Sequence, residues 1–267
     1  MISAAAYRTA EWLERRLPHG WTVPLAVAMA RLAFAIRVPA RRALERNLAA
    51  AIPEGEPIAA AARRAFEPVA RAFVEFLALE RMSSGGLAEA VEVRGREHLD
   101  AAVASKRGVI LLSAHFGNWE WGAAALAAHG VPLHLAARRH GSRTVEAMYE
   151  RRRRAFGLAR LPGQPLWPRA ARVLREQGWL AVMGDRSTPE ARRPVCVWAA
   201  ALARRTGALL LPALTVRTED GRYALIVEPE LTPEACARGA FQEFLMRQLA
   251  RHPGQWCAFE AAPGAPA

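Results

Sequence analysis

The segment that decides the fold runs from residue 108 to residue 120 and reads GVILLSAHFGNWE. Its first half is almost wholly apolar, which is typical of a strand buried on both faces of a parallel sheet. Residues 121–128 are small and apolar and predict a helix, and Gly117 permits a tight turn before it. The segment therefore places His115 at the carboxyl end of a buried strand, where open α/β sheets bind their ligands.

Strand-like and helix-like patterns alternate over the rest of the chain. We expect strands at 91–94, 131–137 and 179–183, a hairpin of strands 209–217 and 222–228, and helices at 144–156, 168–177 and 233–251. Because strands that alternate with helices form a sheet covered by helices, the sequence predicts an α/β fold with a mixed, mostly parallel sheet. We expect one domain: an N-terminal helical, membrane-associating subregion (1–82), an α/β core (83–260) and a disordered tail (261–267).

The composition restricts the class of protein. The 37 Lys and Arg residues exceed the 25 Asp and Glu residues and give a net charge of +12, which favours an anionic partner such as nucleic acid, an anionic lipid surface or an acidic carrier protein. A hydrophobic content of 52% excludes a disordered or collagen-like chain. Three widely spaced cysteines without a CxxC motif exclude a disulfide scaffold and argue against a zinc site.

The most apolar N-terminal stretch covers residues 21–36 and reads WTVPLAVAMARLAFAI. It is shorter than a standard spanning helix, and Arg31 interrupts it. The residues before it mix both signs of charge, so we expect no signal peptide. Two interpretations stay open, an amphipathic helix in the membrane interface and an ordinary buried helix.

His115 and Glu120 carry the chemistry that the motif predicts. The amino end of the following helix disfavours a protonated imidazole, so we expect His115 to be neutral and able to accept a proton. Glu120 lies in the first turn of that helix, from which we expect its carboxylate to turn back and orient the imidazole. The motif contains no Ser or Cys nucleophile, and a base with an orienting acid suits the activation of a substrate hydroxyl. The alternative is a buried histidine next to a surface glutamate.

HFGNWE at residues 115–120 resembles the motif of the bacterial lipid A biosynthesis lauroyl/myristoyl acyltransferases, a family that includes phosphatidylinositol mannoside acyltransferase. Further segments that resemble family elements follow in the family's order: Arg46 to Leu48, RRAFG at 153–157, VMGD at 182–185, 202–217, and Gln255-Trp256. Asp185 is followed by Arg186, where the family usually has Gln.

The resemblance implies a glycerol-3-phosphate acyltransferase-like fold and an acyltransferase at the cytoplasmic face of the bacterial inner membrane, peripheral or monotopic. The acyl chain would pass from acyl carrier protein or coenzyme A to a hydroxyl of a lipid or glycolipid, with no metal and no other cofactor. His115 would be the general base and Glu120 its partner in an HX4E motif. The predicted substrate-binding residues are Gly117, Asn118, Arg153, Arg154 and Asp185.

Two alternatives remain beside this interpretation. The glycerophospholipid and lysophospholipid acyltransferases use H-x4-D with a Gly-Thr-Arg-Ser segment, whereas this chain has Glu120 and the sequence GDRS at 184–187. A non-enzymatic basic protein that binds membranes or nucleic acid is the other alternative, although no RRM, KH, zinc-finger or helix-turn-helix signature is present. The sequence FGNWE favours the lipid A branch.

Overall fold

A computed structural model of the chain describes residues 4–36, 38–49, 57–161, 165–186 and 194–257. Its centre is one seven-stranded sheet with the order β1-β7-β6-β2-β5-β3-β4. The strands are β1 (Val91–Arg94), β2 (Val109–Ser113), β3 (Leu133–Leu135), β4 (Ala159–Arg160), β5 (Trp179–Met183), β6 (Leu209–Arg217) and β7 (Tyr223–Val227). All neighbouring pairs are parallel except the β6–β7 hairpin. The predicted fold class, a mixed and mostly parallel α/β sheet, is confirmed.

The side chains of the central strand β2 pack into two separate hydrophobic cores. Ile110 and Leu112 face one core, while Val109 and Leu111 face the other, and all four side chains are buried. This alternation is what a strand covered on both faces requires. It explains why residues 108–114 lack the polar alternation of a half-exposed strand.

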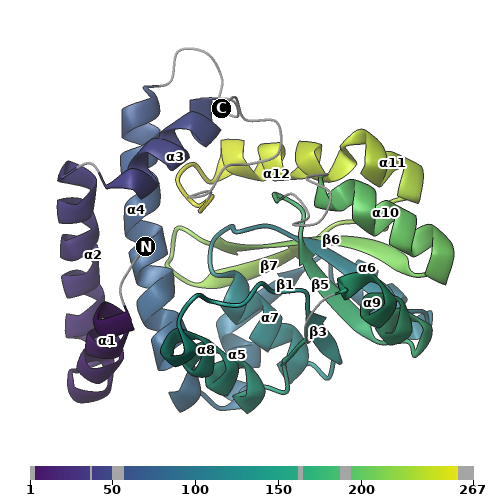
Figure 1. Cartoon of the computed structure of the whole chain (residues 1–267), viewed down its shortest axis with the longest axis horizontal. Helices are drawn as coiled ribbons and strands as arrows, with labels where there is room; N and C mark the ends of the chain where they lie inside the picture. Colours follow the sequence, from purple (N-terminus) through teal and green to yellow (C-terminus); the bar gives the residue numbers. More distant parts are fainter. Residues whose placement is uncertain (1–3, 37, 50–56, 162–164, 187–193, 258–267) are drawn as a thin grey trace.

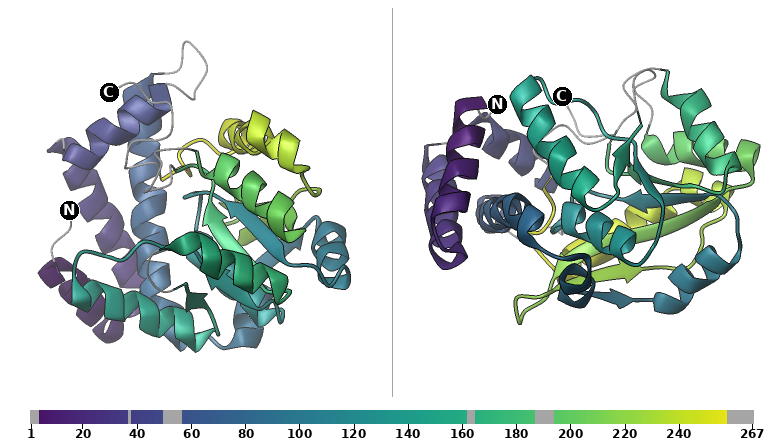
Figure 2. Two further views of the ribbon diagram at one scale, coloured as in Figure 1. Left: turned by 45° about the vertical axis from the view of Figure 1, so that its right-hand side comes forward. Right: turned by 90° about the horizontal axis from the view of Figure 1, so that it is seen from below.

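Helices cover both faces of the sheet (Figures 1 and 2). One face carries α9 (Leu166–Arg175), α10 (Val195–Thr206), α11 (Pro233–Arg238) and α12 (Ala240–Arg251), and the other carries α5 (Ser84–Ala90), α6 (Arg96–Ala104), α7 (Trp119–Ala128) and α8 (Arg143–Ala155). Helices that connect the strands contribute to both layers, as in other α/β sheets, while α5 precedes β1 and α11 and α12 follow β7.

The N-terminal helices form a group beside the sheet (Figure 1). They are α1 (Ala4–Arg16), α2 (His19–Ala35), α3 (Pro39–Ala49) and the long α4 (Ile58–Ala78), which a short 3-10 helix, η1 (Leu79–Arg81), continues. The first half of α4 packs into one core through Phe66, and its second half packs into the other through Phe76 and Leu77. The helical character predicted for residues 1–82 is thus present in the described part, while the boundary at residue 82 stays a prediction. None of the described helices has the length and apolarity needed to cross a bilayer.

Several elements differ from the expected ones. Residues 83–86 read in the sequence as a break between the helical subregion and the core, but they are the start of α5, where the Ser83 hydroxyl caps the helix by accepting the Gly86 N–H. The single helix expected at 233–251 is divided at Gly239, whose φ of 109° ends α11. The α6 and α10 helices and the short strand β4 were not predicted. The tail 261–267, and the core boundary at 260, lie outside the described residues.

Candidate active site

The turn between β2 and α7 contains the motif and requires its glycine and asparagine. Gly117 has a φ of 56°, and a Cβ at this position would lie 2.1 Å from the carbonyl oxygen of Thr215. Asn118 begins α7, because its side chain accepts the Trp121 backbone N–H at 3.2 Å. Both residues therefore have a structural role in the turn. Their contact with substrate stays a prediction.

A buried carboxyl group fastens this turn to α4. Glu75 accepts hydrogen bonds from the Tyr223 hydroxyl and, at 3.3 Å, from the Asn118 amide nitrogen. The Glu75 carbonyl oxygen accepts the indole N–H of Trp121 at 3.1 Å. Burial raises the pKa of the Glu75 carboxyl, and the two side-chain donors oppose that rise. The amino end of α7 is thus held by α4 and β7, far away in sequence.

His115 meets Asp185 at the carboxyl ends of two neighbouring strands. Ser113 of β2 pairs with Met183 of β5 in a parallel register. His115 and Asp185 each follow two positions later, so they lie next to each other. The Nδ1 atom of His115 lies 3.1 Å from Oδ1 of Asp185, and the His115 backbone N–H donates to Oδ2 at 3.2 Å. The Asp185 side chain is 1% exposed and that of His115 is 23% exposed. The ring is therefore accessible, while its carboxylate is not.

The charge state of Asp185 determines the tautomer of His115. Burial opposes ionisation of Asp185, but His115, Arg186 and the indole N–H of Trp256 together hold the pKa of the carboxyl below its usual range. An ionised carboxylate only accepts hydrogen bonds, so Nδ1 carries a proton and donates it. The Nε atom of Arg186 lies 3.3 Å from the same ring nitrogen. Because Nδ1 is a donor, Arg186 contributes its charge here, not a hydrogen bond, and Nε2 is left to accept a proton.

Glu120 has a different partner from the expected one. Arg153 of α8 donates to both of its oxygens, at 3.1 Å from Nε and 2.5 Å from Nη2. Both side chains are nearly buried, and this pairing overcomes the burial penalty and raises the pKa of Arg153. Within the described part of the chain, the carboxylate on the His115 ring belongs to Asp185. The expected His115–Glu120 hydrogen bond is thus corrected: the strand register brings Asp185 to the ring, whereas Glu120 lies on the side of α7 that meets α8.

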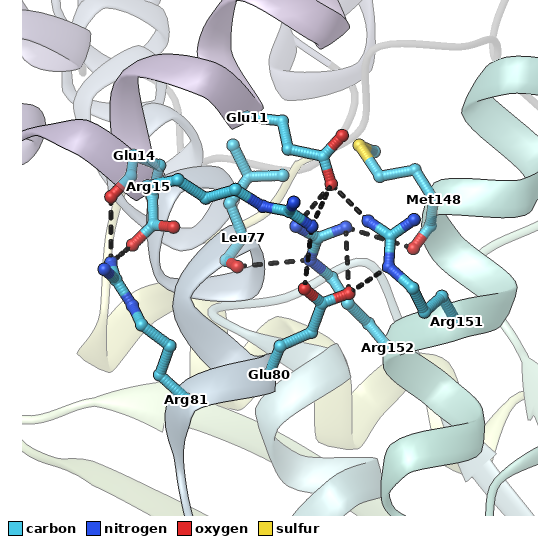
Figure 3. Close-up of polar contacts among 9 residues, drawn as sticks. All are labelled: Glu11, Glu14, Arg15, Leu77, Glu80, Arg81, Met148, Arg151 and Arg152. Carbon is cyan, nitrogen blue, oxygen red and sulfur yellow. Dashed lines mark hydrogen bonds and ion pairs between the residues drawn. The ribbon is translucent and has the colours of Figure 1, made fainter.

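The arginine run at 151–154 is divided among three environments. Arg152 is fully buried, and it donates to the Leu77 and Met148 carbonyl oxygens and to Glu11 (Figure 3). Arg151 pairs with Glu11 of α1 and with Glu80 of η1. These two arginines therefore join α1 to the core and do not reach the His115 site.

Of the two arginines predicted to bind substrate, only Arg153 is buried, and it contacts the motif through Glu120. Arg154 is 76% exposed and pairs with Glu150 one helical turn earlier. The structure does not bring Arg154 to the His115–Asp185 pair. Arg153 reaches the motif only through Glu120, so direct contact of either arginine with substrate stays a prediction.

Trp256, Glu75 and Arg186 lie in the site and were not predicted from the sequence as site residues. Trp256 donates its indole N–H to Asp185 Oδ2 at 3.1 Å, and Glu75 holds the motif turn. Trp256 had a signal, the Gln255-Trp256 pair, but no indication of its partner. Glu75 reads as one more polar position on an amphipathic helix. Among the described residues, no group of three or more His, Cys, Asp or Glu side chains could hold a metal ion.

Comparison with known proteins identifies the family. Residues 3–261 match the model of the bacterial lipid A biosynthesis acyltransferases. The phosphatidylinositol mannoside acyltransferase of Mycolicibacterium smegmatis is 26% identical over 276 residues, an alignment that covers 96% of this chain and 89% of that protein. The expected family resemblance is confirmed, and the His115–Asp185 pair lies within the matched region. The chain therefore belongs to the bacterial lipid A biosynthesis acyltransferases, a family of lipid acyltransferases.

Proposed function

We propose that the protein transfers a fatty acyl chain from an acyl carrier protein or coenzyme A thioester to a hydroxyl group of a lipid or glycolipid. The pairing of the partly exposed His115 ring with the buried, ionised Asp185 carries this proposal. Such a pair is a general base whose tautomer is fixed by its carboxylate. The thioester is a substrate, and the proposed reaction needs no further cofactor.

The proposed reaction uses Nε2 of His115 as the base. Nε2 takes the proton of the acceptor hydroxyl while the hydroxyl oxygen attacks the thioester carbonyl carbon. Asp185 stabilises the imidazolium that forms, because Nδ1 keeps its hydrogen bond to the carboxylate. When the C–S bond breaks, the imidazolium returns the proton to the departing thiolate. The products are the acylated acceptor and the free thiol of the carrier, and the enzyme regains its starting protonation.

Acyl transfer is tested with purified protein, acyl-ACP and acyl-CoA donors, and a panel of glycolipid and lysophospholipid acceptors, with products identified by mass spectrometry. We expect His115→Ala to lose transfer while its circular dichroism spectrum and melting temperature stay near those of the wild type. A wild-type rate from His115→Ala would refute the proposed base. The acceptor panel separates the lipid A-type reaction from the glycerophospholipid alternative.

We also propose that α2 binds the membrane surface at the cytoplasmic face of the inner membrane, to which the two thioester donors have access. One side of α2, together with the residue that ends it, carries apolar side chains that are 41% to 73% exposed: Trp21, Leu25, Met29, Leu32 and Ile36. Their spacing of three or four residues aligns them in one stripe. An apolar stripe on a protein with a net charge of +12 fits an anionic lipid surface.

Membrane binding is tested by co-sedimentation with vesicles of phosphatidylglycerol and phosphatidylethanolamine. We expect the triple variant Trp21→Ser, Met29→Ser and Leu32→Ser to lose most of its binding. Val103→Ser is the matched control, because Val103 is an exposed apolar residue on α6. Equal binding by the triple variant and the control would contradict the assignment of α2.

A further inference from the structure

The last described residues lie along the motif turn. Cys257 donates its backbone N–H to the His115 carbonyl oxygen at 2.6 Å, and Gly117 donates to the Gln255 carbonyl oxygen at 2.8 Å. These bonds form an isolated antiparallel bridge between Phe116 and Trp256. The backbone of His115 is therefore held by a segment about 140 residues further along the chain.

The same segment is fixed from its other side. The Gln255 side chain bonds both backbone groups of Arg217, accepting the N–H at 2.7 Å and donating to the carbonyl oxygen at 2.7 Å. Gly254 has a φ of 89°, and a Cβ there would lie 2.9 Å from backbone and side-chain carbons of Arg64. Anchored to β6 and packed against α4, the segment presents Trp256 to the site in one fixed position.

The Trp256 indole reaches the carboxylate behind the base. Its Nε1 atom lies 3.1 Å from Oδ2 of Asp185, and both side chains are buried. Oδ2 also accepts the His115 backbone N–H at 3.2 Å, while Oδ1 faces the ring nitrogen at 3.1 Å. Oδ2 is itself 3.3 Å from the ring nitrogen, so the imidazole faces both oxygens with Oδ1 the nearer. The two N–H donors on Oδ2 determine how the carboxylate is turned toward the ring.

We propose that Trp256 is a positioning residue, whose indole N–H holds the Asp185 carboxylate in the orientation that aligns the His115 ring for proton transfer. The catalytic consequence rests on the proposed acyl transfer. Trp256 acts through Asp185 and does not touch the reacting atoms. Its effect therefore differs from packing alone, because an aromatic ring of the same size without an N–H would fill the space and lose the function.

Two variants test this role. Trp256→Phe removes the donor, and replacement of Trp256 by benzothienylalanine removes it with hardly any change of shape, because sulfur replaces the indole N–H. Because a hydrogen bond to a charged group is stronger than one between neutral groups, its loss should misalign the carboxylate. We expect kcat to fall about tenfold or more in both variants, with little change in KM. Trp179→Phe is the control, since Trp179 is equally buried in β5 and lies at the opposite end of that strand from Asp185.

The pH profile separates positioning from packing. Among the described residues, the charged groups in contact with the ring are Asp185 and Arg186, and the Trp119 ring packs against it at 5.1 Å between centroids. An Asp185 carboxylate that has lost one donor attracts the protonated ring more strongly. The acid limb of the kcat/KM profile should therefore move to higher pH in both Trp256 variants and stay in place in Trp179→Phe.

Each outcome decides for or against the proposal. Wild-type kcat and an unmoved profile with benzothienylalanine would overturn it, because packing alone would then explain Trp256. If the wild-type protein transfers no acyl chain, the proposed function fails, and the positioning role is decided by the NMR titration of the His115 ring, identified with His115→Ala. A midpoint shifted by Trp256→Phe supports the role, and an unchanged midpoint overturns it.

Discussion

A substitution of Glu120 distinguishes between two roles of the motif glutamate, a structural ion pair with Arg153 and a direct action on the His115 ring. The change is Glu120→Gln, which keeps the shape of the side chain and removes its charge. The carboxylate makes two hydrogen bonds with the Arg153 guanidinium, and the two side chains are only 7% and 9% exposed. Removal of one partner from a buried pair leaves the other charge uncompensated, so we expect a loss of about 3 kcal/mol of unfolding free energy.

The expected change in melting temperature follows from the chain length. An unfolding entropy of about 2.1 cal/mol/K per residue over 267 residues means that 1 kcal/mol shifts the melting temperature by roughly 2 °C. Glu120→Gln should therefore melt about 5 °C below the wild type, as followed by circular dichroism. The double variant Glu120→Gln, Arg153→Met should recover part of that loss, because it buries no unpaired charge.

The controls compare exposure and activity. Glu92→Gln breaks an ion pair with Arg94 in which both side chains are about half exposed, so its effect on stability should stay below about 0.5 kcal/mol. Measured well below the melting temperature, Glu120→Gln should lose less acyl transfer per folded molecule than Asp185→Asn. The reasoning is refuted if Glu120→Gln has the melting temperature of the wild type yet loses acyl transfer as fully as His115→Ala. Glu120 would then act on the His115 ring.

Three further predictions concern the base, the arginine run and the buried carboxyl group. Asp185→Asn should lower kcat by about 10²- to 10⁴-fold, since an amide cannot stabilise the imidazolium; steady-state kinetics over a pH series measures this, and an unchanged kcat contradicts it. Glu11→Ala removes an acidic partner of the fully buried Arg152 and should lower the unfolding free energy by about 2 kcal/mol. Arg154→Ala, at an exposed position, should change the unfolding free energy by less than about 0.5 kcal/mol. Equal denaturation midpoints for the two variants would rule out this difference. Burial raises the pKa of Glu75 above its ordinary value of 4.5, so the stability that its protonated form contributes is complete below that value and is lost as the pH rises through the folded pKa. Glu75→Gln should therefore gain melting temperature relative to the wild type between pH 4.5 and pH 8, and a constant difference would argue against the shift.

Local patterns in the sequence were sufficient for the elements around the site. The apolar run at 108–114 predicted a buried strand, and Gly117 predicted the tight turn before the helix, because glycine favours a left-handed backbone. The motif also identified His115 as the residue at the end of the strand. These features depend on neighbouring residues, so periodicity and residue type determine them.

The partners of the charged residues were decided by tertiary structure. Sequence proximity favoured Glu120 as the partner of His115, but the parallel register of β2 and β5 brings Asp185 to the ring from 70 residues away. The consecutive arginines 151–154 look equivalent in the sequence, yet their different faces on α8 make one solvent-exposed, one fully buried, and Arg153 the partner of Glu120.

The sequence by itself determined the fold class, the family and the place of His115 at the end of a buried strand. Only the folded chain decided that the Asp185 carboxylate lies against the His115 ring, and that Trp256 donates a hydrogen bond to this carboxylate. The physical reason is that a strand or a turn is specified by short-range sterics and hydrophobic periodicity, whereas a hydrogen bond between residues far apart in sequence depends on strand order, register and the depth at which each side chain is buried.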